Sequence, residues 1–208
     1  MWKPAALAAS GDFATLGARG RLQMAFRSGK WEQAYSVSGG YKRSDGGTEN
    51  SDFEKGQGYA NLSLSYDRRI DIGAQLGIAT QSYGANTFYS AKFNNQYEKT
   101  DHGIASLNVS VHNQGRTWEV TPAVYYNKFK DHYQLTRGKE GAAAGENYHN
   151  LDVFGGAVNA YVDWIAGKTA VGVDIGKERI YSTVLGNQLD AADYKSIPGS
   201  DRQYTRKG

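Results

Sequence analysis

GIASLNVSVHNQGRTWEVTPAVYYNKF, residues 103–129, is the stretch that decides the fold of this chain. Its first half alternates strictly, because short polar residues separate Ala105, Leu107, Val109 and Val111. Alternation with a period of two predicts a β-strand that has one apolar and one polar face.

The second half of this stretch repeats the alternation after a turn. Asn113-Gln114-Gly115 is typical of a three-residue hairpin connection that ends in glycine. From Trp118 onward, apolar residues again occupy every second position, which predicts a second strand with Trp118 beside the turn. Pro122 does not fit this pattern, because proline is poorly tolerated in a paired strand, and a β-bulge would accommodate it.

The same pattern recurs along the chain. Further alternating segments are residues 16–27, 31–42, 59–66, 70–81, 151–164 and 169–179. We therefore predict about eight antiparallel strands in four up-and-down hairpins. Tight turns are expected at 28–30, 67–69, 113–115 and 166–168, and long loops between the hairpins, at 43–51, 82–96 and 131–150. Residues 1–12 are expected to be a loose lead-in, 13–182 the sheet, and 183–208 an extracellular loop or truncated end.

Composition narrows the class of protein. The 208 residues include no cysteine, which excludes disulfides and thiolate metal sites. A net charge of +3 gives no indication of nucleic-acid binding. Mean hydropathy is −0.63, and no run approaches the ~20 apolar residues of a spanning helix. A membrane β-barrel stays open, because only alternate residues of its strands face lipid.

Three features favour an outer-membrane barrel over a soluble sheet. Short turns at one end and long loops at the other are typical of such barrels. The strands reach the ~9–11 residues that a tilted spanning strand requires. Four aromatic residues lie beside successive tight turns on the apolar side, as in an interfacial girdle, and they are Trp31, Tyr66, Trp118 and Trp164. The alternative is that these rings belong to the core of a soluble sandwich.

The polar side of the strands predicts a wide interior. It carries short polar residues and glycine, which would fill the inside of a small eight-stranded barrel poorly. A hydrated or plugged lumen suits these residues better.

Three segments resemble a known family. SGGYKRSDGGTENSDF (38–53), SYGANTFYSAKFNNQYEKT (82–100) and VFGGAVNAYVDWIAGKTAVGVDIGKERIYSTVLG (153–186) resemble the barrel domain of TonB-dependent outer-membrane receptors, the cobalamin and siderophore receptors in particular. The similarity covers most of residues 15–187, and GANTFYS followed by NQYE is its most specific part.

This resemblance implies a transmembrane barrel of 22 strands, an N-terminal plug, and nutrient uptake driven by the TonB complex. No plug or TonB-contacting segment is found, no secretion signal precedes the first strand, and residues 204–208 do not form an aromatic-ended last strand. We therefore expect an incomplete part of such a barrel, located in the outer membrane. Its expected partners are outer-membrane lipid, a nutrient ligand, and TonB through a plug that this chain lacks.

Ligand contacts are predicted at two places. Arg19 and Arg21 would attract an anionic ligand such as a ferric siderophore, although they would also suit an ordinary polar lumen. Phe88 and Tyr89, in a long loop, would stack on a ligand.

Metal binding and catalysis are weakly indicated. Asp45, Glu49 and Asp52 share one loop, and their carboxylate oxygens are suitable ligands for Ca²⁺. The resemblance to cobalamin receptors also implies calcium binding in such a loop. The simpler interpretation is a solvated polar loop. No other cofactor is expected. His102 and His112 lie about 34 Å apart along one strand and cannot act together. We expect no enzymatic activity.

Two other functions stay open. One is a self-contained eight-stranded outer-membrane barrel with a structural or adhesion role, in which 16–27 would pair with 169–179. The other is a soluble β-barrel that binds a small apolar ligand, whose apolar side chains would point inward.

Overall fold

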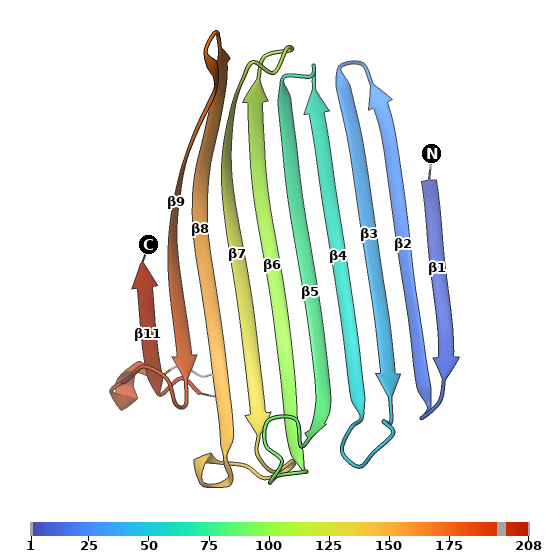
Figure 1. The fold of residues 1–208 in the computed structure, drawn as a ribbon, viewed down its shortest axis with the longest axis vertical. Helices are drawn as coiled ribbons and strands as arrows, with labels where there is room; N and C mark the ends of the chain where they lie inside the picture. The colour runs from blue at the N-terminus through green and yellow to red at the C-terminus, as the bar shows by residue number, and fades with distance from the viewer. Residues whose placement is uncertain (1, 195–198, 208) are drawn as a thin grey trace.

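The computed structural model describes residues 2–194 and 199–207, and its strands form one antiparallel sheet (Figure 1). Each strand from β1 to β8 pairs with the next along the chain, β9 then pairs with β11, and β11 with β10. The strands are β1 Trp2–Gly11, β2 Thr15–Ser28, β3 Trp31–Ser44, β4 Phe53–Tyr66, β5 Ile70–Asn86, β6 Gln96–His112, β7 Trp118–Gln134, β8 Glu146–Trp164, β9 Gly167–Ser182, β10 Asn187–Gln188 and β11 Arg202–Lys207. Two single-turn 3₁₀ helices, η1 Ala142–Ala144 and η2 Ala191–Asp193, lie in loops. Among the described residues, no helix is long and apolar enough to span a membrane.

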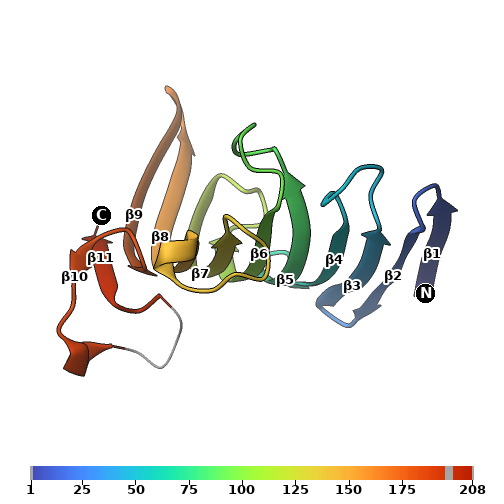
Figure 2. The ribbon, with the colours of Figure 1, turned by 90° about the horizontal axis from the view of Figure 1, so that it is seen from below.

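The predicted up-and-down antiparallel sheet is confirmed, and the sheet is not closed. Seen from below, its two edges lie at opposite ends of the strand array (Figure 2). Residues 16–27 and 169–179 do not pair with each other, because β1 covers the outer side of β2 and β11 covers part of β9. The pairing that a closed eight-stranded barrel requires is therefore absent from the described sheet.

The lead-in predicted for residues 1–12 is wrong, because most of it is β1. This strand pairs with β2 along its whole length, from Trp2 opposite Met24 to Gly11 opposite Thr15. Its sequence, WKPAALAASG, is too rich in alanine to alternate clearly. Pro4 is tolerated because β1 is an edge strand.

The prediction that 183–208 is only loop is also wrong in part. β11 pairs with the loop end of β9, from Arg202 opposite Ser182 to Lys207 opposite Lys177. β10 adds two residue pairs to the outer side of β11. Short polar strands of this kind carry no alternation that would reveal them.

The tight turns and the long loops lie at opposite ends of the sheet, as predicted (Figure 1). The connections at the turn end are residues 29–30, 67–69, 113–117 and 165–166. At the loop end, β1 and β2 are joined by 12–14, and the later loops are 45–52, 87–95 and 135–145. Between β9 and β11 the structure describes residues 183–194 and 199–201, which include β10 and η2. The strands therefore extend further into the predicted loops than alternation indicated.

Pro122 lies in a paired strand without the predicted bulge. β6 and β7 pair up to Asn108 opposite Ala123 and resume at Val111 opposite Val120 in the same register. Since proline has no N–H, the ladder is interrupted there. Ser110 and Thr121 bridge the gap through a hydroxyl–hydroxyl hydrogen bond of 2.8 Å.

Strand register keeps like residues on one face across the sheet. One transverse row reads Leu22, Val37, Ala60, Leu76, Ala105, Tyr126 and Phe154. The neighbouring row on the other side reads Arg21, Ser38, Tyr59, Gly77, Ile104 and Asn127. We call these two sides the apolar face and the polar face.

On β7 the exposure of the two faces is the reverse of that in a soluble sheet, whereas on β4 the polar-face residues Gln57, Tyr59 and Ser63 are exposed and the apolar-face residues between them are half-buried. Along β7, the apolar-face residues from Trp118 to Tyr126 are exposed and the polar-face residues between them are half-buried. Val124 is 47% exposed, whereas Ser110 and His112 on the polar face of β6 are 8% and 3% exposed. The polar face is thus the more enclosed side along β7 and in the turn half of β6.

Hydrogen bonds and close contacts fill this enclosed side. His112 Nε2 lies 3.1 Å from Asp71 Oδ2, which also accepts from Arg116 Nη2 at 2.5 Å. The Tyr125 hydroxyl donates to Asp174 Oδ1 at 3.1 Å and lies over Gly155. A side chain at position 155 would overlap the Tyr125 ring, so glycine is required there for this contact.

Gly155→Ala should lower the free energy of unfolding by about 1 kcal/mol, because the new methyl group displaces Tyr125 and breaks its hydrogen bond to Asp174. Chemical denaturation of the purified protein measures this change. Gly39→Ala is the matched control, since a Cβ there would meet only a carbonyl oxygen at 3.6 Å. Equal stability of the two variants would contradict the contact.

Candidate functional site

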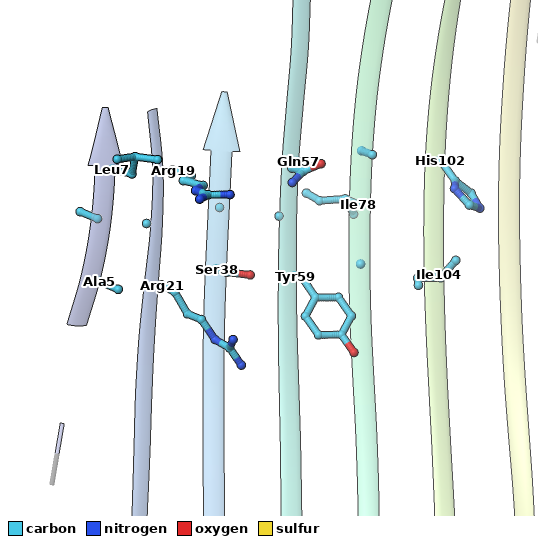
Figure 3. A pocket seen from close by; sticks show the side chains of 16 residues that line it. Ala5, Leu7, Arg19, Arg21, Ser38, Gln57, Tyr59, Ile78, His102 and Ile104 are labelled. Carbon is cyan, nitrogen blue, oxygen red and sulfur yellow. The ribbon is translucent and has the colours of Figure 1, made fainter. Parts of the chain in front are cut away.

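A groove on the polar face is the first candidate ligand site (Figure 3). It has a volume of about 640 Å³ and crosses β1 to β6. Arg19 and Arg21 extend from β2 over β3 (Figure 3). The other polar side chains that line it are Ser38, Gln57, Tyr59 and His102.

The groove is positively charged. Its lining contains two guanidinium groups and no carboxylate. Arg19 and Arg21 lie together because residues two apart in a strand share a face. His102 Nε2 donates to Asn127 Oδ1 at 2.8 Å, so this ring is held by the neighbouring strand. The groove is suited to a small anionic molecule with hydrogen-bonding groups.

Phe88 and Tyr89 belong to a second site, at the loop end. Phe88 is 78% exposed and packs edge-on against Tyr89, with ring centroids 4.9 Å apart. Tyr89 also meets Tyr133 edge-on at 5.5 Å, and its hydroxyl donates to Glu98. Burial, followed by this hydrogen bond, raises the pKa of the Tyr89 hydroxyl, which therefore stays protonated and keeps donating.

The structure does not bring the two predicted ligand-contact pairs into one pocket. Neither Phe88 nor Tyr89 lines the groove that contains Arg19 and Arg21. The arginines lie on β2, and the aromatic pair contacts β6 and β7.

Arg137 joins three loops into one unit that the sequence did not reveal. Its guanidinium donates to both carboxylate oxygens of Asp52, at 2.5 and 2.9 Å. Its backbone N–H donates to the Asn95 carbonyl at 2.7 Å, and its side chain lies 4.9 Å from the Tyr97 ring centroid. Loops 45–52, 87–95 and 135–145 therefore share one charged residue. We call this set of contacts the Arg137 clamp.

Gln96 closes the middle of this loop unit. Its side chain is fully buried, and its Nε2 donates to the carbonyls of Phe93 at 2.7 Å and Asn86 at 3.1 Å. Tyr133 donates to Gln96 Oε1 at 2.8 Å. A buried amide with its hydrogen bonds satisfied fixes the course of the 87–95 loop.

Loop 135–145 is held by Glu146, the first residue of the strand that follows it. The Gly141 N–H donates to Glu146 Oε2 at 2.7 Å, and His132 lies 2.7 Å from Glu146 Oε1. The Gly141 hydrogen bond, first among several, lowers the pKa of Glu146 to about 2. Glu146 is therefore ionised in neutral solution and anchors the 135–145 loop.

The geometry gives the predicted calcium site no support. Both carboxylate oxygens of Asp52 accept hydrogen bonds from Arg137, and Asp45 Oδ1 lies 3.4 Å from Arg43 Nη2. In the described parts of the chain, no three His, Cys, Asp or Glu residues are grouped as metal ligands would be. Calcium at Asp45, Glu49 and Asp52 stays a prediction from sequence alone.

The four turn-end aromatics all lie on the apolar face. Trp31 pairs with Tyr66, with ring centroids 4.8 Å apart. Trp118 is 40% exposed, and Trp164 Nε1 donates to Thr169 Oγ1 at 2.9 Å. Trp31 and Tyr66 share one row, and Trp118 and Trp164 lie in the next two rows toward the tight turns.

No protein-family model, curated protein or solved structure matches this chain. The function is therefore inferred from the faces of the sheet, the groove and the loops.

Asp52→Asn should release the loops, because an amide cannot replace two charge-assisted hydrogen bonds to Arg137. Hydrogen exchange of residues 45–52 and 135–145 should quicken severalfold while the strand centres stay protected. Glu49→Gln is the control, since it removes an exposed acid from the same loop and leaves the clamp intact. Unchanged exchange in Asp52→Asn would contradict the clamp.

The clamp should also weaken in acid. The Arg137 hydrogen bonds, above other causes, lower the pKa of Asp52 below its ordinary value. Because the folded state binds this proton less tightly, the stabilisation is present above about pH 4 and lost as the pH falls below it. Amide protection factors of 45–52, the loop that Glu146 does not anchor, should fall over this range in the wild type and not in Asp52→Asn once they are corrected for intrinsic exchange.

Proposed function

We propose that this chain forms part of the wall of a TonB-dependent outer-membrane receptor barrel that imports a scarce nutrient, and that it carries out no bond chemistry. The observation that carries the proposal is the reversed exposure of the two faces on β7 and in the turn half of β6. Apolar side chains are exposed on the apolar face of β7, and the polar face holds buried hydrogen-bonded groups. This arrangement suits a wall with lipid outside and a polar interior.

The height of the apolar face matches a bilayer. On β8 this face reads Phe154, Gly156, Val158, Ala160, Val162 and Trp164, without a charge. Phe154 and Trp164 are ten residues apart, about 34 Å along the strand, which a tilt of about 40° reduces to roughly 26 Å. The apolar band of outer-membrane barrels is about 25 Å tall.

Aromatic residues mark both borders of this band. Trp31, Tyr66, Trp118 and Trp164 mark the turn end. Tyr126 and Phe154, opposite each other on β7 and β8, mark the loop end, and the Tyr126 hydroxyl donates to Asp152 Oδ1 at 2.6 Å. Rings with one apolar and one polar end favour such borders.

The groove and the clamped loops supply the receptor part of the proposal. A cationic groove on the polar face would face the lumen and attract an anionic nutrient complex such as a ferric siderophore. The Phe88–Tyr89 pair lies at the loop end, where a ligand would arrive first. The resemblance of segments 38–53, 82–100 and 153–186 to cobalamin and siderophore receptors favours this class of ligand.

The open edges favour a larger barrel over the self-contained one. β11 covers β9 only from Lys177 to Ser182, so the turn half of β9 has no partner strand on its outer side in the described sheet. An unpaired edge is not tolerated in hydrocarbon, and the proposal requires further strands to cover it. A soluble β-barrel that binds an apolar ligand would need its apolar side chains to point inward. On β7, by contrast, the apolar side chains are exposed and the polar-face residues are half-buried.

Leu107→Arg tests the lipid-facing assignment. Leu107 lies near mid-height on the apolar face and is 44% exposed. In phospholipid vesicles, arginine there should lower the free energy of unfolding by about 2–4 kcal/mol. Gln75→Arg is the control, because Gln75 is exposed on the polar face at a similar height and should change stability by under about 0.5 kcal/mol. Equal, small effects of both substitutions would favour a soluble sheet.

Uptake tests the transport part. Cells that express the complete gene should accumulate labelled cobalamin or a labelled ferric siderophore. Collapse of the proton gradient should abolish this accumulation. Membrane insertion without energy-dependent uptake of either probe would reject the receptor and retain the structural barrel.

A further inference from the structure

A hollow in the apolar face lies at its border with the loop end. It has a volume of about 550 Å³ and spans β4 to β7. Its lining includes Gly56, Gly58, Ile78, Gly103, Lys128 and Lys130. The cationic groove is built mainly from polar-face side chains, so the two hollows lie on opposite faces of the same strands, and they share the lining residues Gln57, Gly58, Ile78, Ala79 and His102.

Glycines on the apolar face create this hollow. Gly56, Gly58 and Gly103 occur at apolar-face positions of β4 and β6, on either side of Ile78. A Cβ at position 103 would meet no atom within 4 Å, so the space above it is open. Ile78, on β5 between these strands, is 64% exposed. The floor of the hollow is therefore apolar and uncovered.

Lysines border the hollow on its β7 side. Lys130 is exposed and forms no ion pair with any residue that the structure describes, and Lys128 Nζ lies 2.7 Å from Asp152 Oδ1. Asp101 is the acidic residue in the lining. On β5 to β9, the four apolar-face rows from Phe154 to Tyr148 carry the cations Lys99, Lys128, Lys130, Lys177 and Arg179 and the acids Asp101 and Asp152.

The combination of an apolar floor and cationic rim indicates a particular ligand chemistry. Lysines beside a bilayer border attract anionic headgroups at the depth where phosphates lie. An uncovered apolar trough, formed by Gly103 and Ile78 in the same row as Lys128 and one row below Lys130, would accept the upper part of a hydrocarbon chain. A free anion would use the lysines and leave the trough unfilled.

We propose that this hollow binds a phosphorylated lipid, with its phosphate at Lys128 and Lys130 and the upper methylene groups of one chain over Gly103 and Ile78. The inference rests on the proposed function, because it requires the apolar face to contact a bilayer. It adds a specific lipid site to a surface that otherwise contacts lipid non-specifically.

The test uses the complete gene product in vesicles of equimolar phosphatidylcholine and phosphatidic acid. After re-extraction in mild detergent, native mass spectrometry measures the retained phosphatidic acid per protein. Lys128→Gln with Lys130→Gln should reduce retention about tenfold or more. Lys42→Gln with Lys55→Gln removes the same charge from the polar face and should leave retention unchanged.

Gly103→Val tests the trough separately. Its side chain enters open space, so the variant should fold normally, and it should also lower retention by filling the place of the lipid chain. Circular dichroism of each variant checks the strand content. Retention equal to wild type in both Gly103→Val and the Lys128/Lys130 variant would overturn the proposal.

Two further outcomes identify which inference fails. If the wild-type protein does not float with the vesicles, the proposed membrane function fails. If it floats but retains both lipids equally, only the lipid site fails. Displacement of the phosphatidic acid by inorganic phosphate alone would indicate a simple anion site and overturn the lipid proposal.

Discussion

Every other property of this sheet depends on the parity of strand register. A slip of one residue between two strands would transfer all the apolar side chains of one strand to the opposite face. From β2 to β9, the ladders bring apolar residues opposite apolar residues, and the connections at the turn end are short enough to fix that register. The register shift at Gly84 and Asn86 lies at the loop end, beyond the apolar rows, so it leaves the two faces intact.

The two ends of the sheet are stabilised in different ways. At the turn end, the connections are local and the neighbouring rings of Trp31 and Tyr66 are in contact. At the loop end, residues that are far apart in the chain hold one another through buried amides and ion pairs, as Gln96 and Arg137 do. The strands therefore form a fixed wall. The loops form a layer beyond the strand ends, joined by hydrogen bonds and ion pairs of their own.

Much of the sheet could be predicted from sequence, because alternation directly reports a strand with two unlike faces. Eight strands were found in this way, and Arg19 and Arg21 were placed together because they are two residues apart. The sequence does not predict β1, because its alanines do not distinguish an apolar from a polar face. The bulge predicted at Pro122 is wrong, because β6 and β7 keep one register on both sides of this proline. The Arg137–Asp52 pair was beyond sequence reasoning, because its partners are 85 residues apart and meet only through the shapes of three loops.

Pairing between sequence neighbours makes the sheet modular. From β1 to β8, each strand is hydrogen-bonded within the described sheet only to strands that are its neighbours in sequence. Duplication or loss of a whole hairpin would therefore change the width of the wall in steps of two strands, while every remaining side chain kept its side. Gain or loss of a single strand would instead move all later loops to the opposite rim. Evolution of a protein built this way is thus restricted to hairpin-sized changes in circumference.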